Sequence, residues 1–203
     1  DDGVYRSDDF GTSFIDIGLG MQTGQFYNGF SCSSSDSLIA LGQSQDHIPG
    51  YLYGGGLAWA YSAIDEVGWT SIDPSNDNIM YAVDRFGWDV FKSINRGISF
   101  FLLTSFSGDG AWNAPFVVCP ENPSTLYLGD TRVHKSENSG SSWAITNGGS
   151  QLDGNPVLSM ATSASSPDTV YVGTAPLNVR AHIFRTSNGG TSWSDVTKSL
   201  PDR

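Results

Sequence analysis

The stretch SENSGSSW at residues 136–143 is the most informative part of the sequence, because close variants of it recur along the chain. Similar stretches are SDDFGTSF at 7–14, SINRGISF at 93–100 and TSNGGTSW at 186–193, and all four fit [ST]-x-[DN]-x-G-x-S-[FW]. The starts at residues 7, 93, 136 and 186 are separated by 86, 43 and 50 residues. Because 86 is twice 43, the spacing predicts a further unit near residue 50 that has lost the motif. Regular repeats of this length indicate stacked structural units.

A second landmark keeps the same step along the chain. Pro74, Pro120 and Pro167 each precede a short run of β-forming residues, at 79–83, 125–129 and 169–173, and residues 38–42 form a degenerate fourth run. Runs rich in Val, Ile, Leu and Tyr between turn residues are typical of strands. One period of about 45 residues suits a four-stranded sheet.

Each motif predicts a hairpin turn between two strands. The preceding residues alternate apolar and polar at strand period, the Asp or Asn can accept hydrogen bonds from turn amides, and the glycine permits positive φ. The final aromatic side chain would pack against the sheet. The structural positions are Ser7, Asp9, Gly11 and Phe14; Ser93, Asn95, Gly97 and Phe100; Ser136, Asn138, Gly140 and Trp143; and Thr186, Asn188, Gly190 and Trp193.

With these four motifs the chain resembles the Asp-box, or bacterial neuraminidase repeat, β-propellers, which include sialidases, xyloglucanase-type glycosidases and sortilin-like receptors. The resemblance implies an all-β fold, a β-propeller of Asp-box repeats with about four four-stranded blades plus a half blade. In this family the motif lies at the blade periphery, so it implies architecture and no catalytic role.

The strand pattern places the blades at 1–17 (partial), 26–63, 68–104, 114–146 and 156–197 of a single propeller. A four-bladed ring with an extra hairpin would accommodate this count. We favour an open arc of a larger propeller, whose exposed edges must be covered by further blades of the same protein or by self-association.

Charge and composition exclude some partners. The chain carries 10 Lys and Arg against 21 Asp and Glu, a formal net charge of −11, which opposes nucleic acid binding. No window is apolar enough for a membrane-spanning helix, so we expect no membrane insertion. An acidic, Gly- and Ser-rich composition with few lysines favours a secreted or bacterial cell-surface protein.

Residues outside the repeat template are the candidates for ligand binding, because departures from a regular scaffold often mark binding loops. Three stretches stand out, at residues 45–59, 65–69 and 107–113. Their aromatic rings lie beside carboxylates, as a sugar-binding groove requires, whereas the alternative places these rings in the core. The candidate ligand-binding residues are Tyr51, Tyr53, Trp59, Trp69, Trp88 and Trp112.

Glycoside hydrolysis needs two carboxylates that flank the scissile bond. Asp46 and Glu66 are the best catalytic pair, since both adjoin presumed inner strands of one blade, although each could equally be a turn acceptor or a solvated side chain. Asp84, Asp89 and Asp130 flank the Tyr-containing strands with the same two interpretations. The sialidase arginine motif is absent from the sequence.

No cofactor and no metal site are expected. The histidines His47, His134 and His182 are scattered and are interpreted as surface or strand residues, and Cys32 and Cys119 as free thiols. The leading hypothesis is therefore a propeller module that recognises a glycan or an extracellular protein without independent catalysis. The alternatives are a xyloglucanase-like or sialidase-like glycoside hydrolase domain and an architectural assembly module.

Overall fold

The computed structural model describes residues 4–17, 26, 29–43, 51–54, 59–61, 67–84, 89–108 and 110–200, with only the backbone described for 51–54, 59–61 and 67. This part of the chain forms four four-stranded antiparallel sheets and one separate two-stranded hairpin. A 3-10 turn, η1 (Asn147–Gly149), follows the third of these sheets.

The sheets follow one another along the chain, and each pairs its strands in sequence order. The hairpin is β1 (Tyr5–Arg6) and β2 (Ile15–Asp16). The first sheet is β3 (Ser31–Cys32), β4 (Ile39–Gly42), β5 (Tyr51–Gly54) and β6 (Trp59–Tyr61), and the second is β7 (Val67–Ile72), β8 (Met80–Asp84), β9 (Asp89–Ser93) and β10 (Phe101–Ser105). The third is β11 (Phe116–Val118), β12 (Leu126–Gly129), β13 (Val133–Ser136) and β14 (Ala144–Ile145), and the fourth is β15 (Val157–Ser163), β16 (Ser166–Thr174), β17 (Ile183–Thr186) and β18 (Ser194–Asp195).

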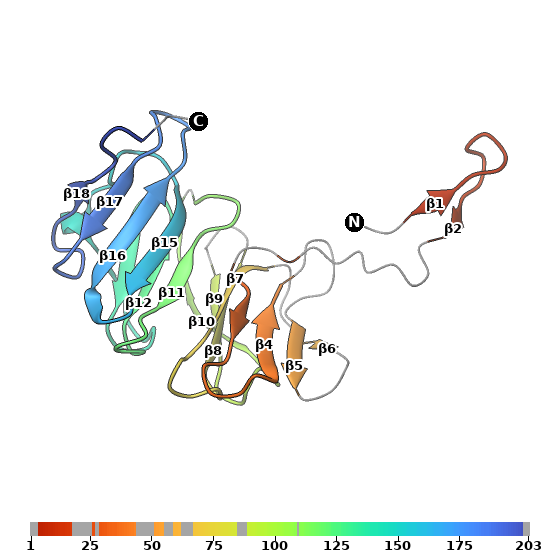
Figure 1. Ribbon diagram of the computed structural model, residues 1–203, viewed down its shortest axis with the longest axis horizontal. Coiled ribbons are helices and arrows are strands. Elements are labelled where there is room, and N and C mark those ends of the chain that lie inside the picture. The colour runs from red at the N-terminus through yellow and green to blue at the C-terminus, as the bar shows by residue number, and fades with distance from the viewer. Residues whose placement is uncertain are drawn as a thin grey trace.

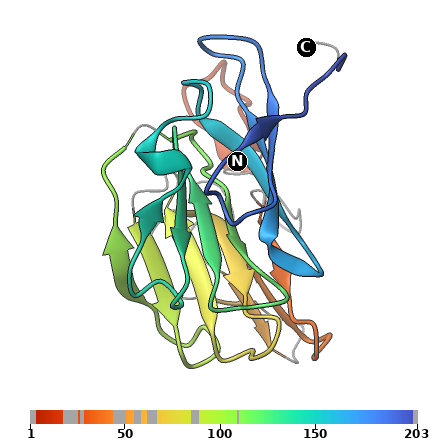
Figure 2. The same ribbon diagram turned by 90° about the vertical axis from the view of Figure 1, so that its left-hand side faces the viewer.

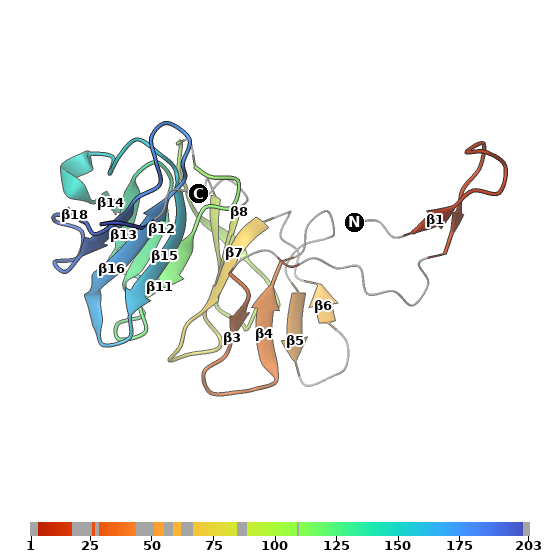
Figure 3. The same ribbon diagram turned by 45° about the horizontal axis from the view of Figure 1, so that its top comes forward.

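The four sheets stack face to face in an arc, and the hairpin β1–β2 stands apart from them (Figure 1). The first strands of successive sheets touch, since β7 contacts β3 and β11, and β15 contacts β11. Figures 2 and 3 show the later sheets one behind the next, with β15–β18 at the end of the stack.

The apolar core lies between neighbouring sheets. Every residue of β12 is buried, because neighbouring sheets cover both faces of this second strand. Its sequence is apolar throughout for the same reason. Three main clusters fill the three junctions: Ile39, Leu41, Ile72 and Met80; Tyr81, Val83, Val90, Phe116, Val118, Leu126 and Leu128; and Cys119, Tyr127, Val133, Val157, Met160, Val170 and Val172.

All four motifs form the turn between the last two strands of their sheet, as the sequence predicts. The same hydrogen bonds recur in each copy. In the copy at 136–143 the Ser136 hydroxyl donates to Asn138 Oδ1 at 3.0 Å and accepts the Gly140 amide at 2.9 Å. Asn138 Oδ1 also accepts the Ser142 amide at 2.8 Å. The eight residues therefore satisfy their own turn amides.

Positive φ occurs at two consecutive positions of each motif. The fifth-position glycines have φ between 77° and 89°, as predicted, and the fourth positions have φ between 55° and 65°. Three of the four fourth-position residues, Phe10, Arg96 and Ser139, are not glycine. The turn therefore imposes the left-handed conformation on side chains that rarely adopt it.

Candidate functional site

The two ends of each sheet carry different connections. In an antiparallel sheet of four strands, the motif turns and the turns between the first two strands lie at one end. The connections between the second and third strands, and the links from one sheet to the next, lie at the other. We call this second end the loop face. In the described residues it is formed by residues 106–108 and 110–115, 130–132, 151–156 and 175–182.

A buried carboxylate and imidazole pair lies on the loop face of the third sheet. Asp130 follows β12 directly and His134 lies in β13, so the tight connection brings the two side chains together, with 2.9 Å between Asp130 Oδ2 and His134 Nε2. Asp130 Oδ1 accepts the Arg132 amide. Asp130 is 2% exposed and His134 is 7% exposed.

The surroundings of Asp130 favour its charged form. Burial by itself raises the pKa of this carboxyl, but the hydrogen bond and charge of His134 and the Arg132 amide outweigh burial, and the pKa is lowered. The Asp130 carbonyl accepts the Val157 amide at 2.8 Å, and the Phe106 ring lies 4.6 Å from the His134 ring. The pair thus connects the hairpin β12–β13 to Phe106, before the third sheet, and to Val157, at the start of the fourth.

A second such pair lies on the loop face of the fourth sheet. Asp153 Oδ2 is 2.9 Å from His182 Nδ1 and accepts the Thr174 hydroxyl at 2.7 Å. Asn155, two residues on, accepts the Asn178 amide at 2.7 Å through its side-chain oxygen. These bonds join the link that enters the sheet to the connection between β16 and β17.

Both pairs fix loops in place. The pair of Asp130 and His134 is buried, whereas the pair of Asp153 and His182 is half-buried. The sequence patterns did not identify either pair, because Asp153 and His182 are far apart in the chain. For the first pair, the sequence does contain an indication, because Asp130 and His134 lie close together on either side of a predicted turn. Asp130 is a turn acceptor, one of its two predicted interpretations, and its other carboxylate oxygen lies within hydrogen-bond distance of His134.

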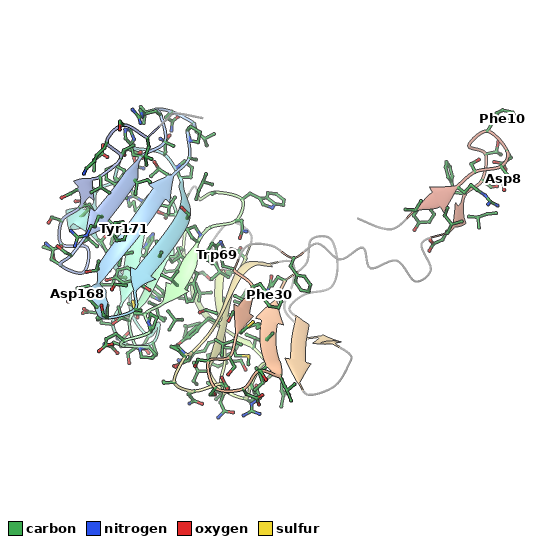
Figure 4. All side chains as sticks on the ribbon, viewed as in Figure 1. Asp8, Phe10, Phe30, Trp69, Asp168 and Tyr171 are labelled. Atoms are coloured by element: carbon green, nitrogen blue, oxygen red, sulfur yellow. The ribbon has the colours of Figure 1, made fainter. Side chains whose placement is uncertain are left out.

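Two of the predicted ligand-binding aromatic residues have described side chains. Trp112 lies on the loop face and is 50% exposed. Trp69 (labelled in Figure 4) is half-buried and packs against the cluster between the second and third sheets, and its ring lies against Gly29, where an added Cβ would lie 2.8 Å from the ring. Trp112 therefore presents about half of its surface to solvent, whereas Trp69 packs against other side chains of the protein.

The remaining candidates cannot be placed. Asp46, Glu66 and Trp88 lie outside the described residues, as does His47. For Tyr51, Tyr53 and Trp59 the structure describes the strands β5 and β6 but not the side chains. The predicted catalytic pair and these ring positions stay predictions.

The described residues hold neither a metal-ligand cluster nor a disulfide. There, no group of three or more His, Cys, Asp and Glu side chains is arranged to hold a metal ion. Cys32 is exposed, Cys119 is buried, and neither forms a disulfide. The described part of the chain contains no helix of the length and apolarity that crossing a membrane requires.

In the part of the chain that the structure describes, two clefts open near the motif turns. One of about 350 Å³ is lined by Lys135, Glu137 and Trp143, and one of about 290 Å³ lies between residues 144–148 and 189–191. The second cleft follows a junction between two sheets. Lys135 borders both.

Sheets of four antiparallel strands that pack face to face in an arc define a partial β-propeller, as the sequence predicted. No protein-family model matches the chain. A xyloglucanase of Hypocrea jecorina is 28% identical over 126 residues, which are 62% of this chain and 12% of that enzyme. The xyloglucanase Xgh74A of Acetivibrio thermocellus is 25% identical over the same share of both chains.

Solved structures agree on the fold. The GH74 xyloglucanase of Xanthomonas campestris superposes with a TM-score of 0.69 and 17% identity, covering 88% of this chain and 31% of that one. The chain therefore spans a small part of the proteins that it resembles, and its fold is that of their propellers.

Proposed function

We propose that this chain is part of a secreted, glycan-recognising β-propeller whose loop face binds a β-glucan of the xyloglucan type. The similarity to xyloglucanases is the observation that carries the proposal. The assignment of the four turns to the Asp-box type belongs to it, supported by the hydrogen-bond network that all four copies share.

The loop face has two properties that glycan binding requires. Its connections are held by the carboxylate and imidazole pairs at Asp130 and Asp153, so a bound polysaccharide meets loops that are already ordered. Trp112 offers an exposed ring there, and flat aromatic rings stack on sugar rings. We propose Tyr51, Tyr53, Trp59, Trp69 and Trp88 as further ring positions of the same groove.

Binding to tamarind-type xyloglucan, measured by isothermal titration calorimetry, tests this function. We expect Trp112→Ala to weaken binding about tenfold, the loss of roughly 1.4 kcal/mol from one stacking contact. Phe10→Ala is the matched control, because Phe10 is an exposed ring on the hairpin tip, far from the loop face (Figure 4). Equal affinity for xyloglucan and an unrelated α-glucan would rule the proposal out.

Hydrolysis is the second candidate function, favoured by the enzymatic names of the relatives. Here we propose Asp46 and Glu66 as the two carboxylates, one as acid and one as base or nucleophile. Release of reducing ends from xyloglucan should be lost in Asp46→Asn and in Glu66→Gln while binding persists. Release that survives both substitutions removes this pair.

A further inference from the structure

Two Asn-Gly pairs lie in very different surroundings. Asn147 and Gly148 belong to the turn η1 after the third sheet, and Asn188 and Gly189 lie in the motif turn of the fourth sheet. A third pair, at residues 28–29, lies partly outside the described residues. An asparagine followed by glycine is prone to react with the backbone, because glycine has no side chain to shield its nitrogen. The two described pairs therefore show how the fold controls this reaction.

The reaction converts an asparagine side chain into a carboxylic acid. The backbone nitrogen of the following residue gives up its proton and attacks the side-chain Cγ. A new N–C bond forms, the side-chain nitrogen leaves as ammonia with that proton, and a succinimide ring results. Water then opens the ring at one of its two carbonyl groups, which yields aspartate or isoaspartate. The reaction is favoured by a backbone nitrogen outside any hydrogen bond, by an amide side chain that is free to turn, and by open space around both.

The motif turn holds Asn188 against this reaction. Gly189 is buried and donates its amide to the Asp168 carbonyl at 3.0 Å. Asn188 Oδ1 accepts the Thr186 hydroxyl at 2.9 Å and the Ser192 amide at 3.0 Å. Asn188 Nδ2 donates to the Ser192 hydroxyl at 2.9 Å. The attacking nitrogen and the amide under attack are therefore both fixed in other hydrogen bonds.

The turn η1 leaves Asn147 in the opposite state. Among the described residues, no acceptor receives the Gly148 amide, and the Asn147 side chain makes one hydrogen bond, from Nδ2 to the Gln151 carbonyl at 3.3 Å. That distance lies beyond the usual range for an N–H donor and an oxygen. Gly148 is exposed, and a Cβ added to it would meet nothing within 4 Å. Both reacting groups are therefore accessible.

We propose that Asn147 is a self-modification site, at which the folded protein converts the side chain to aspartate or isoaspartate while Asn188 is preserved. The reaction needs water and no enzyme, and it is independent of the glycan-binding proposal. A carboxylate at position 147 adds a negative charge to a chain whose formal net charge is already −11. It also has no proton to donate to the Gln151 carbonyl, so the hydrogen bond between them is lost.

The position of Asn147 connects this change to the packing of the sheets. Its backbone amide donates to the Gly190 carbonyl at 2.7 Å, across the junction between the third and fourth sheets. Its carbonyl accepts the Ser150 amide at 3.1 Å, which closes η1. Isoaspartate carries the main chain through the former side chain and lengthens it, so the turn that follows this junction must change shape.

Peptide mapping of the full chain after storage in mildly alkaline buffer tests the proposal. Trypsin places the two pairs in separate peptides, 136–180 and 186–198, and fragment ions in the mass spectrometer locate the acid within each. We expect Asn147 in the folded chain to convert about tenfold or more faster than Asn188, because reaction at Asn188 first requires its turn to open.

The same chain in concentrated urea is the matched control. Unfolding removes the hydrogen bonds around both pairs, so Asn147 and Asn188 should then convert at similar rates. Asn147→Gln is the second control, because a glutamine side chain closes the larger ring with difficulty. Its folded chain should leave peptide 136–180 in the amide form.

Three results would overturn the proposal. Equal conversion of Asn147 and Asn188 in the folded chain would show that the fold does not distinguish the two pairs. Conversion of both in urea and of neither in the folded chain would show that η1 protects Asn147 as well. Acid formed in peptide 136–180 of Asn147→Gln as fast as in the wild-type chain would place the reaction at another residue.

Discussion

The motif turns at residues 136–143 and 7–14 have the same internal hydrogen bonds and different surroundings. In the first, Ser136, Asn138 and Gly140 are held in a turn that rests on the preceding sheet through Leu103. In the second, Ser7 and Asp9 make the same bonds at 2.7–2.8 Å, yet every residue of the turn after Ser7 is exposed. Eight residues therefore suffice to specify the turn. The packing around the turn at 136–143 comes from the preceding sheet.

The first and largest predicted contrast concerns the glycines. Gly140→Val should lower the free energy of unfolding by about 3 kcal/mol or more, because it adds strain at positive φ and a clash with Leu103. Gly11→Val has the same backbone strain but no neighbouring sheet to displace, so the main unfolding transition should be unchanged. Urea unfolding followed by tryptophan fluorescence measures both, and equal losses would contradict the contrast.

The second contrast concerns the final aromatic residues of the two turns. Trp143 packs against Phe106 with ring centres 5.3 Å apart and donates its indole nitrogen to the Gly140 carbonyl, so Trp143→Ala should cost about 2–3 kcal/mol. Phe14 is 64% exposed, and Phe14→Ala should leave the main transition in place. Thermal unfolding of the two variants, followed by circular dichroism, measures both effects. Equal losses of stability would contradict the difference in packing between the two turns.

The third prediction uses acid to test the loop face. The lowered pKa of Asp130 means that its contribution to stability is complete above the unfolded pKa near 3.8 and is lost as pH falls through the folded value. Asp130→Asn should cost about 1–2 kcal/mol at pH 7 and less at low pH, where the native carboxyl is protonated. Denaturant unfolding at several pH values measures this, and a cost independent of pH would argue against a charged Asp130.

The smallest effect is a titration. The hydrogen bonds from the Ser13 side chain and amide and from Ser7 lower the pKa of Asp9 to about 2, while the other three turns carry an uncharged Asn there. Acid should therefore loosen the free hairpin between pH 3.8 and about 2 and leave the Asn turns intact. Carboxyl carbon shifts in NMR report the pKa, which Ser13→Ala should raise towards its ordinary value.

Much of the architecture was predictable from local patterns. The motif spacing and the runs around Tyr81, Tyr127 and Tyr171 indicated the sheets, because turn residues and apolar strands carry their own conformational preferences. The hairpin turns and the fifth-position glycines followed from the same reasoning. The positive φ at Ser139 did not, since serine has no intrinsic preference for that conformation.

Contacts between units were harder to predict. Lys92, which precedes a motif, and Tyr81, in a second strand, are both visible in the sequence. The contact of Lys92 with the Ser139 carbonyl in the next motif turn depends on how the sheets stack. The pair formed by Asp153 and His182 spans a whole sheet for the same reason. Residues on the connections lie outside the repeat, so the sequence indicates stretches such as 107–113 as candidates but does not identify the partner of each side chain.

The separate apolar clusters between successive sheets have a mechanical consequence. Each cluster joins one pair of neighbours, so a chain held at its two ends transmits load through junctions in series. Under tension the sheets should release one at a time. A sheet such as that of residues 116–145 would add roughly 100 Å of extended chain at each step, which gives a saw-tooth force trace with a regular period.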